Sequence, residues 1–195
     1  MYLKLKRLFD IAASFFGILI LSPVFLVLIS AIRISSPGGA FFLQKRVGQN
    51  KKFFYIFKFR TMFTDTPSDK PTHLLENPFA HITPIGRFLR KTSLDELPQL
   101  FNILKGDMSL VGPRPALWNQ DDLVAERDKY GANNVRPGLT GLAQIKGRDE
   151  LPIPVKAAYD GEYIRKMGFW FDLKITFLTL FSVTKGEGVK EGAGK

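Results

Sequence analysis

The sequence contains no cysteine, and this absence excludes two classes of site. Neither a disulfide bond nor a thiolate metal centre can form without cysteine. Histidine is nearly absent as well: His73 and His81 both lie in a proline-rich segment, which disfavours a histidine general base or a Ser-His-Asp site. The chain also has no glycine-rich nucleotide-binding loop and no dinucleotide fingerprint.

Negative charge is scarce relative to positive charge. The 195 residues include 28 Lys and Arg against 18 Asp and Glu, for a formal net charge of +10. Such a chain can bind nucleic acid, anionic lipid headgroups or phosphorylated small molecules, and charge alone does not choose among them. With 45% hydrophobic residues and 18 Phe, the chain can nevertheless build the core of one compact domain.

The hydrophobic residues are concentrated in one uncharged run of 22 residues, 11–32. About 20 apolar residues suffice to cross a bilayer as a helix. The basic start of the chain is typical of a signal peptide, but the apolar run is too long and has no small-residue cleavage site. The same length disfavours a buried helix of a soluble protein. We infer that the run associates with a membrane.

Ser22 and Pro23 interrupt this run at its middle. Pro23 removes the hydrogen bond to the Leu19 carbonyl and kinks a helix, and Ser22 can bond back by one turn. Basic residues flank the run on both sides, whereas the positive-inside rule requires an asymmetry between the two sides of a span. A re-entrant helix, bent at Ser22-Pro23 and leaving by the face that it entered, satisfies both observations. A kinked spanning helix stays open as the alternative.

The remainder of the chain predicts a mainly α structure with minor β. The aromatic stretch 53–60 indicates a strand or a buried segment, 64–84 contains four prolines and predicts a loop, and the tail beyond 184 should fray. Residues 135–148 are rich in glycine and predict a folded loop. Helical patterns cover 85–91, 98–105, 119–130 and 157–167.

Residues 169–183 predict a helix of a different kind. Asp172, Thr176 and Thr179 fall on one face, and large apolar side chains cover most of the rest. The segment is too short to span a bilayer, so we expect an amphipathic helix in the membrane interface with Trp170 at headgroup level. A buried core helix is the alternative.

Asp95 and Glu96 form an adjacent pair of carboxylates where a helix should begin. Ser93 and Glu96 have the spacing of a capping box, which is a purely structural interpretation. Pro98 favours a helix that starts after the pair, because proline prefers the first helical position. In either case the helix dipole favours ionised carboxylates, which suits a nucleophile or a metal ligand.

Basic residues surround this pair in the sequence, and two of them adjoin prolines. Arg114 lies between Pro113 and Pro115, and Arg136 precedes Pro137. Stiffly held guanidinium groups suit phosphate recognition, because the planar fork pairs with two oxygens and little entropy remains to be lost. Each arginine alone would be an ordinary loop residue. Several of them beside two acids and a membrane segment indicate a phosphate-handling site with Mg²⁺.

Five motifs in series make the sequence recognisable, and together they extend over nearly the whole chain. The motifs are Lys58-Phe59-Arg60-Thr61-Met62, Ser93-Leu94-Asp95-Glu96-Leu97-Pro98-Gln99-Leu100-Phe101-Asn102, Lys105-Gly106-Asp107-Met108-Ser109, Gly112-Pro113-Arg114-Pro115 and Arg136-Pro137-Gly138-Leu139-Thr140-Gly141. With these motifs, the chain resembles the bacterial sugar transferase family, the monotopic phosphoglycosyl transferases. It is similar to the small form that consists of the catalytic domain alone.

The resemblance implies a fold, a reaction and a set of residue roles. The fold is monotopic, with a re-entrant helix broken at Ser22-Pro23. Asp95 is implied as the nucleophile that attacks the sugar-bearing phosphate of a UDP-sugar and releases UMP, after which polyprenol phosphate accepts the phosphosugar. Glu96 completes the dyad, and Mg²⁺, with Asp95 as its protein ligand, neutralises the diphosphate. The resemblance implies Lys58, Arg90 and Arg114 as basic residues of the active site. Together with Arg136, which its neighbouring proline indicated, they are the expected phosphate-binding residues.

These implications define the expected organisation. Residues 1–36 form the re-entrant helix, 37–185 the catalytic domain, and 186–195 a flexible tail. We expect the enzyme at the cytoplasmic face of the bacterial inner membrane, in an early step of exopolysaccharide, capsule or other glycoconjugate assembly. Its partners are the UDP-sugar, polyprenol phosphate and membrane lipid, with no nucleic acid; a homodimer stays open. Two alternatives are a non-catalytic basic membrane module and a glycosyltransferase that releases UDP.

Overall fold

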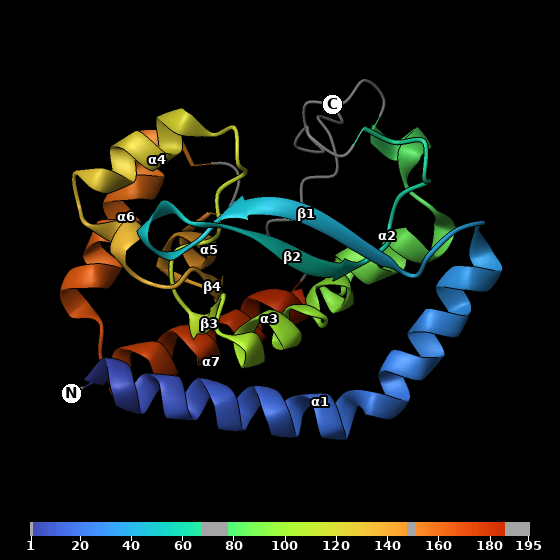
Figure 1. The fold of residues 1–195 in the computed structure, drawn as a ribbon, viewed down its shortest axis with the longest axis horizontal. Helices are drawn as coiled ribbons and strands as arrows, with labels where there is room; N and C mark the ends of the chain where they lie inside the picture. The colour runs from blue at the N-terminus through green and yellow to red at the C-terminus, as the bar shows by residue number, and fades with distance from the viewer. Residues whose placement is uncertain (1, 68–77, 148–150, 186–195) are drawn as a thin grey trace.

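The computed structural model describes residues 2–67, 78–147 and 151–185. Figure 1 shows one long bent helix, α1 (Tyr2–Ser35), running along the edge of a small body that contains a β-hairpin and several shorter helices. The prediction of a mainly α fold with minor β is confirmed. The predicted tail 186–195 and residues 68–77 of the predicted loop lie outside the described residues.

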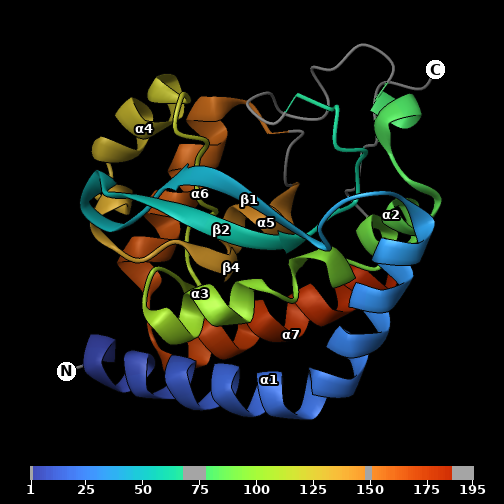
Figure 2. The ribbon, with the colours of Figure 1, turned by 45° about the vertical axis from the view of Figure 1, so that its right-hand side comes forward.

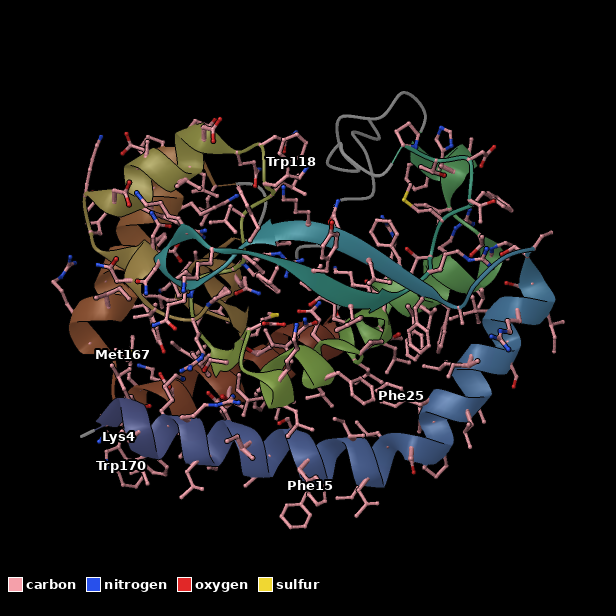
Figure 3. All side chains as sticks on the ribbon, in the orientation of Figure 1. Lys4, Phe15, Phe25, Trp118, Met167 and Trp170 are labelled. Atoms are coloured by element: carbon pink, nitrogen blue, oxygen red, sulfur yellow. The ribbon has the colours of Figure 1, made fainter. Side chains whose placement is uncertain are left out.

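Helix α1 bends but does not break. Pro23 lies inside it, and the Ser22 hydroxyl donates a hydrogen bond of 2.8 Å to the Leu19 carbonyl, as the sequence predicted. Figure 1 shows the second half of α1 turning upward beside the body, and Figure 3 places Phe25 close to this turn. In the described part of the chain, α1 alone is long and apolar enough to cross a membrane.

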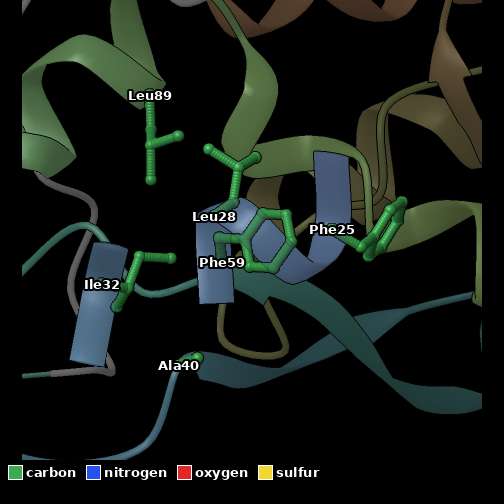
Figure 4. Packing of buried hydrophobic residues seen from close by; sticks show 6 residues of the cluster. All are labelled: Phe25, Leu28, Ile32, Ala40, Phe59 and Leu89. Carbon is green, nitrogen blue, oxygen red and sulfur yellow. The ribbon is translucent and has the colours of Figure 1, made fainter. Parts of the chain in front are cut away.

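The concave side of α1 packs onto the body. Phe25, Leu28 and Ile32 are buried against Phe59 and Leu89, as Figure 4 shows. The opposite side exposes a continuous series of large apolar residues, and Figure 3 shows one of them, Phe15, pointing away from the body. Exposed apolar surface of this extent marks an interaction with a membrane or another protein. This series consists of Leu8, Phe9, Phe15, Phe16, Leu19, Ile20, Leu26 and Val27.

Strands β1 (Phe41–Val47) and β2 (Phe53–Phe59) form an antiparallel hairpin. Strand β2 confirms the predicted aromatic strand. In contrast, strand β1 was not predicted from the sequence. Alternate residues of β2 point inward, as a strand requires, and pack on helix α3 (Gln99–Lys105). This packing places the C-terminal end of β2 beside the N-terminal end of α3.

Two short strands, β3 (Ser109–Val111) and β4 (Gly138–Thr140), pair in parallel. They bring two of the sequence motifs together, because Gly112 donates to the Thr140 carbonyl at 2.8 Å. A Cβ on Gly112 would lie 2.6 Å from the Arg136 carbonyl oxygen, so only glycine fits there. The predicted folded loop 135–148 therefore contains β4, followed by the short helix α5 (Leu142–Lys146).

Three further helices confirm the helical patterns of the sequence: α2 (Pro84–Lys91), α4 (Asp121–Asp128) and α6 (Ile153–Lys166). Thr83 caps α2 by accepting a hydrogen bond from the Gly86 amide. A buried ion pair joins α4 to α6, with 2.7 Å between Arg127 Nη2 and Asp160 Oδ2. The described ends of the predicted loop 64–84 include a 3₁₀ turn, Pro78–His81.

The last helix, α7 (Phe169–Lys185), has its polar face turned inward. Asp172 and Ile175 are buried, and the Thr179 hydroxyl lies 2.6 Å from that of Thr140. Trp170 and Phe177 belong to an outer face of exposed apolar side chains, so α7 is not a buried core helix. Figures 1 and 2 both show α7 beside the first half of α1. Exposed large apolar residues on α7 are Phe169, Trp170, Leu173, Phe177, Leu178, Leu180 and Phe181.

Candidate active site

The acidic pair lies in a short 3₁₀ turn, Leu94–Glu96, between α2 and α3. Helix α3 begins after Pro98, so Asp95 and Glu96 stand just outside its N-terminal end, as Pro98 predicted. Ser93 has a left-handed backbone with φ of 55° and makes no side-chain cap. The capping-box interpretation is therefore wrong. A left-handed non-glycine residue stores strain, and such strain is common beside functional groups.

Three segments that are far apart in the sequence meet at this turn. Lys58, from the end of β2, places its Nζ 2.8 Å from Glu96 Oε1 and 3.7 Å from Asp95 Oδ2. Arg114, from the loop after β3, places its Nη2 2.8 Å from the same Glu96 oxygen. The expected site residues Lys58, Asp95, Glu96 and Arg114 thus form one cluster, which we call the acid–base cluster.

Arg90 approaches the acid–base cluster from α2. Its Nε donates to the Thr61 hydroxyl at 2.9 Å. Burial raises the pKa of Asp95, and the positive charge of Arg90 opposes part of this rise. Arg90 therefore belongs to the surroundings of Asp95, as expected. Thr61 belongs to the first of the five motifs and was not predicted as a site residue. Its hydroxyl group orients Arg90 toward the site.

The two adjacent carboxylates have opposite electrostatic environments. Burial raises the pKa of Asp95, and the negative charge of Glu96 adds to this effect, while Lys58 opposes it. Burial acts in the same direction on Glu96, but Arg114 and Lys58 together outweigh it and hold the pKa of Glu96 well below its ordinary value. Paired acids whose pKa values are driven apart are typical of two different catalytic roles.

Asn102 connects α3 to β2, the two elements beside which Glu96 and Lys58 lie. Its amide oxygen accepts from the Phe57 backbone N–H at 2.9 Å, and its amide nitrogen donates to the Tyr55 carbonyl at 2.8 Å. The side chain is fully buried and joins α3 to the edge of β2. Asn102 thereby fixes Lys58 relative to Glu96. The sequence placed Asn102 at the end of a motif, but only the packed structure gives it this role.

The loop that carries Arg114 is attached to β1. Arg46 donates from Nη1 to the Pro115 carbonyl at 3.0 Å, and the Val47 amide donates to the Ala116 carbonyl at 2.9 Å. The side chain of Arg114 is 35% exposed, against 18% for that of Glu96. Arg114 therefore forms the solvent-facing part of the acid–base cluster, where a phosphate can reach it.

Arg136 does not join the cluster. Its Nε donates to the Gly106 carbonyl at 2.8 Å, at the C-terminal end of α3. Arg7 donates to two other carbonyls at that end, those of Ile103 and Leu104. A cation at a helix C-terminus satisfies free carbonyls and complements the helix dipole. The placement of Arg136 thus departs from the expected phosphate site.

The donor set of the cluster is compatible with Mg²⁺. No group of three or more His, Cys, Asp or Glu suited to a metal occurs among residues 2–67, 78–147 and 151–185. Mg²⁺ does not need such a group, since it is commonly held by one or two carboxylates together with substrate phosphates and water. Asp95, which has only the longer of the two contacts to Lys58, is the carboxylate better able to turn toward an ion.

Comparison with known proteins gives a consistent family. The family described as "Bacterial sugar transferase" matches residues 1–186. The chain is 42% identical to the sugar transferase EpsL of Bacillus subtilis (strain 168), covering 96% of this chain and 91% of that protein. It is 41% identical to an undecaprenyl-phosphate glucose phosphotransferase of Komagataeibacter xylinus, covering 90% of this chain and 35% of the relative.

The name of a third relative contains both of its substrates. The UDP-glucose:undecaprenyl-phosphate glucose-1-phosphate transferase of Klebsiella pneumoniae is 41% identical, over 90% of this chain and 39% of its own length. The chain therefore spans nearly all of EpsL but well under half of the two phosphotransferases.

Proposed function

The chain belongs to the bacterial sugar transferase family and is a transferase, and from this premise we propose that it moves a sugar-1-phosphate from a UDP-sugar to polyprenol phosphate with release of UMP. The observation that supports this most is the difference between the two carboxylates: Glu96 binds two cations, whereas Asp95 is buried and more weakly paired. The names of the relatives support the same donor and acceptor classes.

In the first step Asp95 is the nucleophile. One of its carboxylate oxygens bonds to the phosphorus that carries the sugar, and the bond from this phosphorus to the bridging oxygen breaks, so that UMP leaves with the electron pair. Burial removes water from the Asp95 carboxylate and raises its pKa, and both effects favour nucleophilic attack by the ionised form. The product is a phosphosugar bound covalently to Asp95.

In the second step polyprenol phosphate takes the phosphosugar. One of its phosphate oxygens attacks the same phosphorus, the bond to Asp95 breaks, and the Asp95 carboxylate is regenerated. The lipid product is a polyprenol diphosphate sugar.

The basic residues supply the charge neutralisation that phosphoryl transfer requires. Glu96 holds Lys58 and Arg114 on one oxygen and so keeps their positive charges beside Asp95. Arg90 adds a third positive charge. Mg²⁺, held by Asp95 and by the diphosphate, would supply further neutralisation when bound.

We further propose that α1 is re-entrant and that α7 lies in the membrane interface. The outward apolar faces of α1 and α7 require lipid, while the polar sides of both helices are used within the protein. This arrangement leaves the acid–base cluster at the cytoplasmic face, where a soluble nucleotide and a lipid phosphate can meet. Lys4 or Gln49 is replaced by a single cysteine and treated with a label that does not cross the membrane. Both cysteines should be labelled in inverted vesicles, which expose the cytoplasmic side, and neither should be labelled in right-side-out vesicles. Labelling of the two cysteines from opposite sides would establish a kinked span instead.

The experiment that tests the reaction is incubation of the enzyme with a UDP-sugar alone. One equivalent of UMP per active site should appear before any polyprenol phosphate is added, and intact-protein mass spectrometry should detect the added phosphosugar. Release of UDP would identify an ordinary glycosyltransferase. With a panel of UDP-sugars, UMP formation only when polyprenol phosphate is present would favour direct attack by the lipid, and absence of both products would favour the non-catalytic membrane module.

A further inference from the structure

Helix α3 and strand β3 adjoin the residues of the acid–base cluster in the sequence, and both contact the start of α1. Helix α3 follows directly after Asp95 and Glu96, and strand β3 leads directly into the loop of Arg114. We call residues 2–14 the N-terminal arm of α1. The described contacts of this arm include charged hydrogen bonds to α3, to β3 and to α7. A membrane anchor would need none of these contacts.

The contact between the arm and α3 is made by Arg7. Its Nη1 donates to the Ile103 carbonyl at 2.6 Å and its Nη2 donates to the Leu104 carbonyl at 2.9 Å. These carbonyls belong to the last turn of α3, where the helix does not satisfy all backbone acceptors. The Ile103 carbonyl also accepts from the Gly106 amide at 3.1 Å. The guanidinium fork therefore fixes the arm to the end of α3 that is farther from the acidic pair.

The contact with β3 is made by Asp10. Its Oδ1 accepts from the Leu110 amide at 3.0 Å, and its side chain is almost completely buried. Leu110 lies four residues before Arg114. A buried carboxylate is costly unless hydrogen bonds satisfy it, so this contact has to be maintained once the arm is packed.

A second path to β3 runs through Asp172 of α7. Its carboxylate pairs with Lys6 and accepts the Tyr2 hydroxyl at 2.7 Å, both from the arm. It also accepts the Tyr163 hydroxyl at 3.0 Å, and this hydroxyl lies 3.1 Å from the Val111 carbonyl. The single proton of Tyr163 serves one of these oxygens at a time. Val111 is the last residue of β3, three positions before Arg114.

We propose that the N-terminal arm of α1 positions the active site. Asp10 binds β3 directly, and Asp172 holds the arm and the Tyr163 side chain beside β3, so that Arg114 stays against Glu96. Asp172 touches neither the acid–base cluster nor any reacting atom of the proposed reaction, so it is a positioning residue. For its effect on turnover this inference rests on the proposed function. The packing part of the inference does not.

The first test measures hydrogen exchange in the full-length protein in lipid nanodiscs. Asp172→Asn should speed exchange of the amides of residues 109–112 and of Arg114 by about tenfold or more, since a hydrogen bond to a charged group is lost. Tyr163→Phe removes only the hydroxyl group and should speed the same amides by a smaller factor. The matched control is Thr176→Val on α7, whose hydroxyl bonds only to the Asp172 carbonyl of its own helix. Equal exchange in all four proteins would overturn the proposal.

The second test is a double-mutant cycle on UMP release. Tyr163→Phe should lower the single-turnover rate about three- to tenfold in the wild type, the range of one neutral hydrogen bond. It should have much less effect in the Arg114→Lys background, because Arg114 is then no longer there to be positioned. Equal effects in both backgrounds, measured well below the melting temperature, would reduce the role of the network to global stability and overturn the positioning role.

The two tests separate this inference from the proposed function. If segment 109–114 exchanges faster but no UMP is ever formed by the wild type, the reaction is wrong and the positioning of β3 by the arm stands. If UMP is formed and neither test responds to the substitutions, the reaction stands and the positioning role of Asp172 is refuted.

Discussion

The two ends of α3 use the same kinds of residue for different purposes. At its N-terminal end two carboxylates meet Lys58 and Arg114, while at its C-terminal end Arg7 and Arg136 bind backbone carbonyls. Both arrangements follow the helix dipole, with acids at the start and bases at the finish. Only the first leaves charged groups that can exchange a protein partner for a substrate. Arg7 and Arg136, which bind backbone carbonyls, stabilise the fold. Arg114, which binds the Glu96 carboxylate, can exchange this partner for a substrate phosphate.

Asp95→Asn, at the N-terminal end of α3, should cause the largest loss in the rate of UMP release. An amide cannot attack phosphorus, so UMP release from the UDP-sugar should fall by at least about ten-thousand-fold, as for other covalent nucleophiles. The melting temperature should stay unchanged or rise, because a buried carboxylate with a raised pKa is lost. Single-turnover assays and thermal unfolding of the same sample measure both. A rate within tenfold of the wild type would exclude Asp95 as the nucleophile.

Removal of divalent metal should also affect only the site at the N-terminal end of α3, so that it lowers activity without changing stability. With EDTA, the rate of UMP release should fall by at least about a hundredfold, since metal-ion neutralisation of a phosphoryl group is worth several kcal/mol. Addition of Mg²⁺ should restore it, and thermal unfolding without substrate should be the same in both conditions. A rate that is insensitive to EDTA would show that Lys58, Arg90 and Arg114 neutralise the diphosphate without a metal.

Arg114→Lys keeps the positive charge but loses the planar fork. We expect a fall of roughly ten- to a hundredfold in the single-turnover rate, the equivalent of one charge-assisted hydrogen bond. Folding should survive, because the side chain is partly exposed. Steady-state and single-turnover rates of UMP release provide the measurement, with circular dichroism as the folding control. Wild-type turnover would make Arg114 an ordinary loop residue.

The same substitution at Arg136 should have the smallest effect on chemistry. Arg136→Lys loses the Nε contact to the Gly106 carbonyl, so the protein should lose about 0.5–1.5 kcal/mol of stability. The rate of UMP release per folded molecule should change by less than about twofold, since this contact lies at the far end of α3. Equal losses of rate for Arg114→Lys and Arg136→Lys would remove the distinction between the two ends.

The sequence predicted most of the elements and most of the acid–base cluster, for identifiable reasons. Helix α1, strand β2 and helices α2 and α3 carry strong local signals: a long apolar run, aromatic alternation and well-placed prolines. Lys58, Asp95, Glu96 and Arg114 lie in motifs whose order along the chain is specific. Pro98 also indicated correctly that the acidic pair stands outside α3.

What the sequence could not predict depends on contacts between distant segments. Strand β1 has no clean alternation and is defined by its pairing with β2. Strands β3 and β4 are three residues each and exist only because the two motifs pack side by side. Proline predicted a stiff backbone at Arg136 but not the direction of its side chain. Asp172 was correctly placed on the polar face of α7, yet that face turns toward Tyr163 and not toward water.

The contact between Tyr2 and Asp172 has a consequence for how the enzyme is made. These residues are 170 positions apart, so the ribosome adds 170 residues after Tyr2 before its partner exists. During that interval α1 has its apolar side to place in lipid but no acceptor for Tyr2 or Lys6. A nascent chain that ends before α7 therefore has a membrane helix and the acid–base residues without a closed fold. Activity should begin only when α7 has left the ribosome and packs beside α1, so that Asp172 can bind Tyr2 and Lys6.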